Sequence, residues 1–169
     1  MAAITATEII ALLDLKPLPV EGGYYAETYR SDLLIAADSG VVHSESPRHL
    51  STAIFYLLTP ETFSALHRLP GPEVYHFYLG DPVDLTVLHP DGDVEVIPLG
   101  IDLRQRMRPQ VVVPGGVWQG SCLREGSEFA LMGTTMSPGF HPDDFELGDR
   151  QHLELIFPEA SGLIARLTR

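Results

Sequence analysis

The sequence predicts an all-β fold, a sandwich or barrel, with a short helix at its N-terminal end. Runs of five to nine apolar and β-branched residues recur along the chain, separated by Gly, Pro and Asp. No segment after the first helix is long enough to predict a second one. The clearest runs are Leu50–Leu58, Phe63–Leu69, Glu73–Leu79, Val83–His89, Val94–Pro98, Pro109–Val113, Val117–Leu123 and Glu128–Met136.

The helix is expected over Thr7–Leu15, where apolar residues recur at helical spacing behind a threonine that can cap the free amides. Pro17 ends it. Between two later runs, Asp91-Gly92 supplies the backbone of a tight hairpin turn. We find no linker or repeat, so the prediction is one domain over 1–169, with 1–20 as a helical lead-in and 21–157 as the barrel.

The charge balance excludes some partners. The 169 residues carry a formal net charge of −12 at pH 7, and this field repels phosphate backbones and anionic lipid surfaces. The sequence therefore predicts neither a nucleic-acid nor a membrane partner. A single cysteine, Cys122, cannot form an internal disulfide, and residues 1–16 lack a signal-peptide pattern, so we expect a cytoplasmic protein.

The segment from Phe63 to Gly80 carries the most informative polar residues. If Pro70-Gly71-Pro72 turns the chain into a hairpin, His67 falls opposite Glu73 and on the same face as Tyr75. His76 then points to the other face, unless a bulge between Glu73 and His76 changes the alternation.

Three functions for this cluster stay open. His67, Glu73 and His76 could supply ligands to a divalent metal ion, with Gln119 or water completing the site. Alternatively, His67 acts as a general base held by Glu73, with Tyr75 as its proton-transfer partner. In the third case, these groups only hydrogen-bond a ligand or one another inside a polar pocket.

Further motifs complete a recognisable pattern. They are Glu21-Gly22-Gly23-Tyr24-Tyr25 with Glu27-Thr28-Tyr29-Arg30, Ser51-Thr52-Ala53-Ile54, Ser64 to Arg68, Glu73 to Pro82, Val113 to Gln119, Ser137-Pro138-Gly139-Phe140 and Asp144-Phe145-Glu146-Leu147. Together these blocks resemble the cupin-5 family (DUF985), in order, over roughly residues 8 to 150.

The resemblance implies a double-stranded β-helix, or jelly-roll barrel, paired as a homodimer and related to cupins that resemble sugar-nucleotide 3,5-epimerases. In the first cupin motif, Glu73 and Gly80 match the usual spacing, but Arg68 follows His67 where a second histidine is expected. In the second motif, Gln119 stands where metal-binding cupins place a histidine. Both departures weaken a metal site, and no cofactor beyond a divalent metal is suggested.

A pocket inside the barrel is the remaining expectation. Its predicted lining joins an aromatic wall to hydrogen-bonding groups and would suit a small polar ring such as a sugar or nucleobase. The predicted lining residues are Tyr24, Ser64, His67, Glu73, Tyr75, His76, Trp118 and Gln119. The leading hypothesis is a carbohydrate-type isomerase or epimerase that uses His67 as base. A metal-dependent enzyme and a non-catalytic sensor barrel are the alternatives, so enzymatic activity itself stays open.

Overall fold

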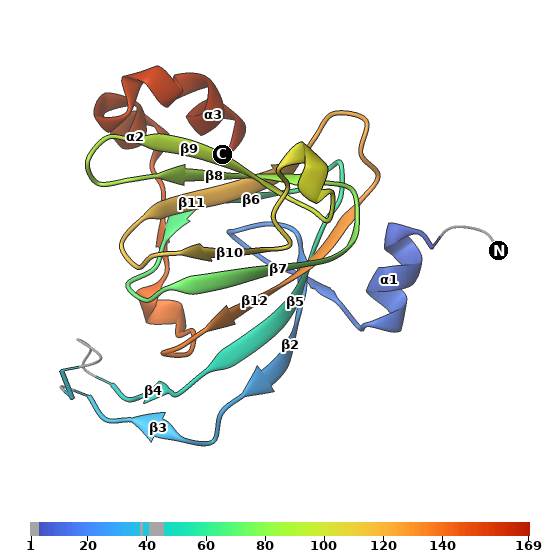
Figure 1. Ribbon diagram of the computed structural model, residues 1–169. Helices are drawn as coiled ribbons and strands as arrows, with labels where there is room; N and C mark the ends of the chain where they lie inside the picture. The colour runs from blue at the N-terminus through green and yellow to red at the C-terminus, as the bar shows by residue number, and fades with distance from the viewer. Residues whose placement is uncertain (1–3, 38, 41–45) are drawn as a thin grey trace.

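The computed structural model describes residues 4–37, 39–40 and 46–169, and its main feature is a pair of facing antiparallel sheets (Figure 1). The first is six-stranded, in the order β1 (Lys16–Pro17), β2 (Tyr24–Arg30), β5 (Thr52–Leu58), β12 (Ala130–Met136), β7 (Glu73–Gly80) and β10 (Gln110–Val113). The second is five-stranded, in the order β13 (Glu146–Leu147), β6 (Phe63–Arg68), β11 (Trp118–Leu123), β8 (Val83–Leu88) and β9 (Val94–Leu99). β3 (Leu34–Ile35) and β4 (Arg48–His49) pair as a separate two-stranded antiparallel sheet. This arrangement confirms the all-β prediction.

The main core fills the space between the two sheets. Alternate residues of the strands point inward, as the two-residue period of a half-buried strand requires. Tyr56 and Tyr75 come from the six-stranded sheet, and Leu85 and Val87 come from the five-stranded sheet. The expected turn at Asp91-Gly92 is confirmed, because β8 and β9 pair as a hairpin in which Gly92 has a positive φ of 99°.

The first helix, α1 (Ala6–Leu12), begins earlier than the sequence predicts. The cap is Thr5 rather than Thr7, because Thr5 and Glu8 form a reciprocal capping box at the first turn. The helix packs with Ile9 on the outer face of the six-stranded sheet, where it contacts a satellite core that contains Leu57 and Leu131.

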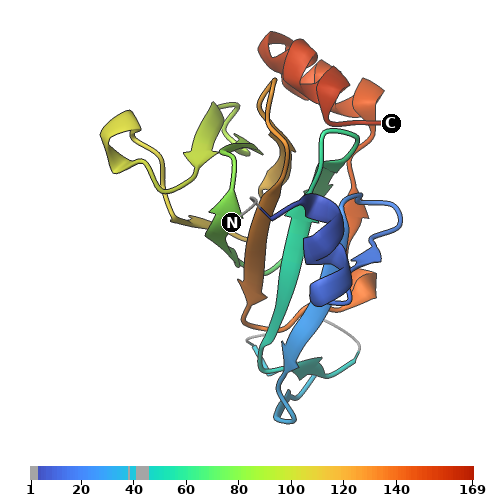
Figure 2. The ribbon, with the colours of Figure 1, turned by 90° about the vertical axis from the view of Figure 1, so that its right-hand side faces the viewer.

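Two short helices that the sequence does not predict, α2 (Arg150–Ile156) and α3 (Ser161–Arg166), lie over the five-stranded sheet (Figures 1 and 2). The 3₁₀ turn η3 (Pro158–Ala160) links them. Their apolar residues Leu153 and Ile164 pack onto Leu66 and Trp118 of the sheet. Each helix is too short to be stable by itself, so its stability comes from the packing of its buried residue on the sheet.

The segment around His67 pairs differently from the prediction. The predicted hairpin between β6 and β7 does not form, because β6 pairs with β11 and β13 while β7 pairs with β12 and β10. The Pro70-Gly71-Pro72 connection instead carries the chain from one sheet to the other. His67 and Glu73 therefore lie on facing sheets.

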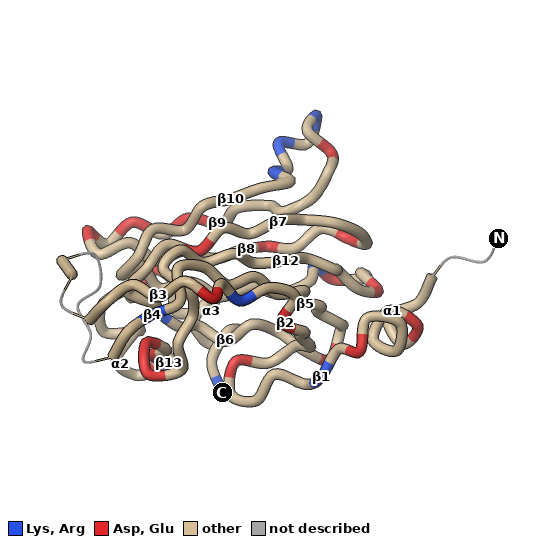
Figure 3. The backbone as a smooth tube through the Cα atoms, turned by 90° about the horizontal axis from the view of Figure 1, so that it is seen from below, with Lys and Arg blue, Asp and Glu red and all other residues tan. Residues whose placement is uncertain are grey.

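Basic residues gather at the tip of a projecting loop that contains the 3₁₀ turn η1 (Leu103–Gln105) (Figure 3). Arg104, Arg106 and Arg108 are all exposed there. No helix among the described residues is long and apolar enough to cross a membrane.

Candidate functional site

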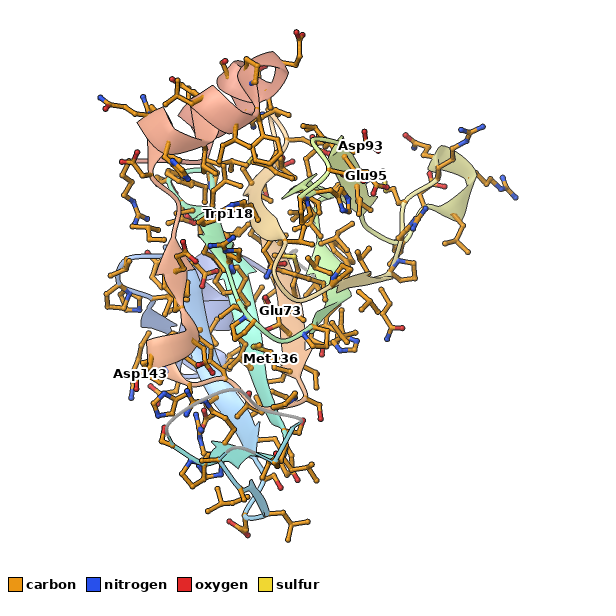
Figure 4. The ribbon with its side chains drawn as sticks, turned by 90° about the vertical axis from the view of Figure 1, so that its left-hand side faces the viewer. Glu73, Asp93, Glu95, Trp118, Met136 and Asp143 are labelled. Carbon is orange, nitrogen blue, oxygen red and sulfur yellow. The ribbon has the colours of Figure 1, made fainter. Side chains whose placement is uncertain are left out.

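A cavity of about 410 Å³ lies between the two sheets, beside the main core. Apolar and aromatic side chains make up most of its wall, while charged groups stand at a few positions. The lining residues are Leu18, Pro19, Val20, Glu21, Tyr25, Glu27, Arg30, Thr52, Ala53, Ile54, His67, Leu69, Glu73, Thr134, Met136, Phe140, Pro142 and Phe145. Figure 4 shows Glu73 and Met136 near each other. A mainly apolar wall with a few charged groups is the usual composition of a small-molecule site.

His67 is held firmly in this wall. Its Nδ1 lies 2.8 Å from the carbonyl oxygen of Ala65, and its ring stacks on Phe145 at a centroid distance of 5.1 Å. Because a carbonyl can only accept, Nδ1 carries a proton and donates it. The second ring nitrogen, Nε2, is left to face Glu73, whose Oε2 lies 3.9 Å away.

Gln119 joins these two residues from the neighbouring strand β11. Its Nε2 donates to Glu73 Oε2 at 2.6 Å and lies 3.4 Å from His67 Nε2. Its Oε1 is buried without a hydrogen-bond partner among the described residues. The pairing of β11 with β6 shifts register between Gln119 and Ser121, next to this contact. The three side chains thus form one buried polar group.

Glu21 is a charged residue of the cavity that is absent from the predicted pocket residues, as are Glu27 and Arg30. It comes from a tight loop over residues 18–23 in which Val20 has a positive φ of 71°. This backbone conformation is costly for a β-branched residue, so the surrounding contacts must hold it. Tyr56 Oη donates to the Gly22 carbonyl at 2.9 Å, and the side chain of Arg169 donates to the Val20 carbonyl. The Glu21-Gly22-Gly23 motif is the sequence signal that could have identified this loop.

Burial and neighbouring charge set the proton affinities in the cavity. Burial lowers the pKa of His67, but the charges of Glu21 and Glu73 outweigh it and raise the pKa to about 9. Burial also raises the pKa of the Glu21 carboxyl, opposed by the charge of His67 and by a hydrogen bond from Ser64. Consequently His67 carries a positive charge at neutral pH, and the Glu21 proton is held more tightly than in water.

Two ion pairs lie at the cavity. Arg30–Glu27 stands at the exposed rim, and Arg48–Asp144, which we call the buried clamp, lies behind the wall. Arg30 donates two hydrogen bonds to Glu27, at 2.9 and 2.5 Å. Arg48, only 3% exposed, donates to both carboxylate oxygens of Asp144 at 2.8 and 2.7 Å. Asp144 ends the 3₁₀ turn η2 (Pro142–Asp144) and precedes Phe145, so this clamp fixes two residues of the cavity wall.

Several residues expected in the pocket do not line the cavity. Ser64 is fully buried and donates to Glu21 Oε1 at 2.7 Å. Tyr75 is 1% exposed within the main core, where burial first and the charge of Glu73 second raise its pKa well above 10. Tyr24 packs on the outer satellite core, and its neighbour Tyr25 lines the cavity instead.

Trp118 is not a wall of the cavity. It is buried under α2 and α3, in the core cluster that contains Leu153 and Phe157. Figure 4 shows it toward the helices, away from Glu73. On its other side, the Arg68 guanidinium lies 4.6 Å from the ring centroid.

His76 lies on the outer face of the six-stranded sheet. Residues Glu73 to His76 pair with β12 without a bulge, so strict alternation turns His76 away from the cavity. Its ring nitrogens lie 3.2 Å from Thr135 Oγ1 and 3.2 Å from Gln110 Nε2. The predicted metal site requires His76 to lie beside His67 and Glu73. The structure does not bring these three residues together.

The remaining polar groups do not fit a metal centre well. Among the described residues, no group of three or more His, Cys, Asp or Glu side chains is placed to hold a metal ion. In addition, an N–H of Gln119 points at Glu73 Oε2, the oxygen nearest His67. Carboxylate and imidazole ligands would need that space for a cation.

Two packed antiparallel sheets around a lined cavity define this chain as a protein of the cupin fold. A solved oxalate decarboxylase from Bacillus subtilis supports that class at the level of fold alone, with 13% identity and a TM-score of 0.54 over 92% of this chain and 38% of that chain. The model of the family described as "Cupin superfamily (DUF985)" matches residues 7–148. The chain belongs to this family.

Closer relatives have no stated activity. An uncharacterized protein of Saccharomyces cerevisiae, YML079W, is 31% identical over 157 residues, which cover 87% of this chain and 78% of the relative. A hypothetical protein from Leishmania major has a TM-score of 0.87 and 30% identity, covering 98% of this chain and 99% of that one. Protein SO0799 from Shewanella oneidensis has a TM-score of 0.86 and 33% identity, with 99% of each chain covered.

Proposed function

We propose that the cavity binds a small polar molecule and that His67 and Glu21 exchange protons with it, as in a carbohydrate-type isomerase or epimerase. The observation that carries this proposal is the position of His67. Its Nδ1 is anchored on Ala65, while Nε2 is held beside Glu73 in the wall of a cavity of about 410 Å³. An imidazole that is anchored through one ring nitrogen and has the other at the cavity wall is the geometry of a proton-transfer group.

The charges in the cavity favour a particular division of roles. His67 is positively charged at neutral pH, so it is suited to donate a proton to a carbonyl oxygen. Glu21, whose pKa is raised by burial, is suited to accept a proton from the adjacent carbon. The sequence-based hypothesis gave the base to His67; the proposal gives it to Glu21 instead, because the charges of Glu21 and Glu73 favour the protonated form of His67.

The proposed reaction is a proton shift through an enol. Glu21 takes the proton from the carbon next to a carbonyl, and the electrons of that C–H bond form a carbon–carbon double bond. The electrons of the carbonyl π bond take the Nε2 proton of His67, which becomes neutral. In an epimerisation, Glu21 returns the proton to the opposite face of the same carbon while the enol O–H returns its proton to His67 Nε2, which regenerates the carbonyl and both residues. In an isomerisation, the same carbon carries a hydroxyl group: Glu21 returns the proton to the former carbonyl carbon, that hydroxyl gives its proton to His67 Nε2, and the carbonyl moves to the carbon that bore the hydroxyl.

Glu73 and Gln119 act as positioning residues in this scheme. Glu73 stabilises the imidazolium through its charge, and the Gln119 amide fixes the Glu73 carboxylate through a 2.6 Å hydrogen bond. Tyr75 lies behind Glu73 in the core and supports the same carboxylate rather than contacting the ligand.

The test joins ligand discovery to a proton-exchange assay. A thermal-shift library of neutral sugars, keto acids and nucleobases identifies compounds that stabilise the folded protein. Each stabilising compound that carries a carbonyl is then incubated with the protein in D₂O, and deuterium incorporation at carbon is followed by NMR. We expect incorporation with the native protein and its loss in both His67→Gln and Glu21→Gln.

The control is His76→Gln, because His76 lies on the opposite face of the sheet. This variant should exchange deuterium at the native rate. Binding without exchange in the native protein would favour the non-catalytic sensor barrel. No stabilising compound at all would overturn the binding proposal.

A further inference from the structure

The charged groups around the cavity are not balanced. Arg30 is already occupied at the rim by two hydrogen bonds to Glu27. Deeper in the cavity, the positive charge of His67 acts on both Glu21 and Glu73. One imidazolium thus faces two carboxylates, and apart from Arg30 no other Lys, Arg or His lines the cavity among the described residues.

Glu21 is the carboxylate left without a cation of its own. The Ser64 hydroxyl donates to its Oε1 at 2.7 Å, which satisfies one oxygen with a neutral donor. His67 Nε2 is instead placed beside Glu73. A buried carboxylate that lacks a paired cation is costly, and a ligand with donor groups would lower that cost.

Beside Glu73, a second acceptor is unsatisfied. Gln119, 2% exposed, uses its amide N–H group on Glu73, and its Oε1 has no hydrogen-bond partner within the part of the chain that the structure describes. The deep part of the site therefore has more acceptor oxygens than donors. The walls around it are apolar and aromatic, with Tyr25, Phe140 and Phe145 among them.

Resting on the proposed ligand-binding function, we propose that the ligand presents N–H or O–H donors, uncharged or cationic, to Glu21, with an apolar ring or face against the aromatic wall. Molecules that present a carboxylate or a phosphate are rejected. Such an anion would meet Glu21 and Glu73, while both nearby cations already face carboxylates. Free sugars and nucleobases belong to the accepted class, and nucleotides and sugar phosphates do not.

Three probes of one shape separate the possibilities. Benzamidine, benzamide and benzoate share a six-membered aromatic ring and differ in the charge of the attached group. Calorimetric titration of the whole protein at pH 7 should give the tightest binding for benzamidine, weaker binding for benzamide and none for benzoate. In Glu21→Gln, which keeps the size and the acceptor oxygen, we expect benzamidine to bind at least tenfold more weakly.

The matched control is Glu95→Gln on β9, which Figure 4 shows on a part of the sheet distant from Glu73. It removes the same charge and should leave benzamidine binding unchanged. Benzoate binding as tightly as benzamidine, or an equal loss in both variants, would overturn the inference and leave the cavity as a ligand site. A library that stabilises the protein while benzamidine does not bind would overturn the inference alone. If neither the library nor any probe binds, both proposals fail.

Discussion

His67 and Glu73 face each other across the interior of the barrel, from strands β6 and β7 of opposite sheets, with 3.9 Å between Nε2 and Oε2. The Pro70-Gly71-Pro72 connection between them makes this possible, because it crosses from one sheet to the other. The pair consequently depends on how the two sheets pack. Changes in sheet packing and changes in protonation of the pair should affect one another.

The stability of the protein should fall as the pH rises above neutrality. The pKa of His67 is about 9 in the folded protein and 6.5 in the unfolded chain, so the folded state binds more protons between these values. The stabilisation is complete below about pH 6.5 and is lost through pH 9. Urea unfolding at several pH values should show this decline, and His67→Gln should flatten it. An unchanged slope in the variant would contradict the assignment.

Replacing Gln119 by Met should raise the pKa of His67 further. The amide N–H that now binds Glu73 Oε2 is lost, so the carboxylate charge acts more fully on the imidazolium. NMR titration of the His67 ring measures the effect. Ser121→Ala, which removes another buried and unpartnered polar atom on the same strand, serves as the control and should leave that pKa unchanged. A lower His67 pKa in the Met variant would contradict the inference that the Gln119 amide weakens the effect of the Glu73 charge on His67.

Metal addition should not stabilise the protein through His67. His67 and Glu73 face the cavity from opposite sheets, whereas His76 lies on the outer face of the six-stranded sheet, and an amide N–H points at Glu73. Elemental analysis of protein purified without a metal-binding tag, and thermal shifts with Mn²⁺, Zn²⁺ and Ni²⁺, provide the test. One equivalent of bound metal that is lost in His67→Ala but kept in His76→Ala would contradict this prediction. It would show that a metal ion binds at His67, beside Gln119.

The Arg48–Asp144 clamp should contribute far more to stability than the Arg68–Glu146 pair. Side-chain exposure is 4% and 19% in the first pair and 40% and 54% in the second. Asp144→Asn leaves the buried guanidinium without its counter-ion, at an expected cost of about 3–5 kcal/mol. Glu146→Gln should cost about 0–1 kcal/mol. Chemical denaturation measures both, and equal costs would contradict the role of the buried clamp.

A homodimer is a further proposal. β2 has β1 beside only its first residues, so no described strand pairs with the other edge of its segment from Ala26 to Arg30, where Tyr29 is 54% exposed. Unprotected edges of this kind favour pairing with a second chain. Light scattering at micromolar concentration should give twice the monomer mass. A Tyr29→Lys variant should then dissociate, and a monomeric native protein would overturn the proposal.

The strands and the central pair were predictable from the sequence, whereas the cavity wall was only partly so. Alternating apolar residues identify β7 and β8 directly, because each strand buries one face in the core. His67 and Glu73 do meet, although by a sheet-to-sheet crossing that residue alternation cannot reveal. The sequence offers no equivalent signal for the pairing partners of β6.

Three residues were placed wrongly or missed, and in each case the position depends on tertiary packing or backbone conformation that the residue pattern does not show. Trp118 lies under α2 and α3, and those helices are too short and too dependent on the sheet to be recognised by periodicity. Glu21 enters the cavity through the left-handed backbone of Val20, a conformation that glycine favours and valine does not indicate. Tyr25 rather than Tyr24 faces inward, and the Tyr24-Tyr25 pair alone does not indicate which of the two lies on the inner face of β2.

The double-sided burial of β6 determines how the site can move. Leu66 packs under the C-terminal helices, His67 faces the cavity, and the strand is hydrogen-bonded to β11 and β13 on its two edges. The amide hydrogens of this strand that bond to β11 should therefore exchange with solvent only when the whole protein unfolds. The loop of residues 18–23 is held by single hydrogen bonds, such as Ala65 N–H to the Glu21 carbonyl, rather than by a strand ladder, so it should open locally and expose the Ala65 amide with it. A ligand would then enter past the loop of residues 18–23 and bind against strand β6, which does not move. Hydrogen-exchange protection gained on binding should therefore be confined to residues 18–23 and the segment around Phe145.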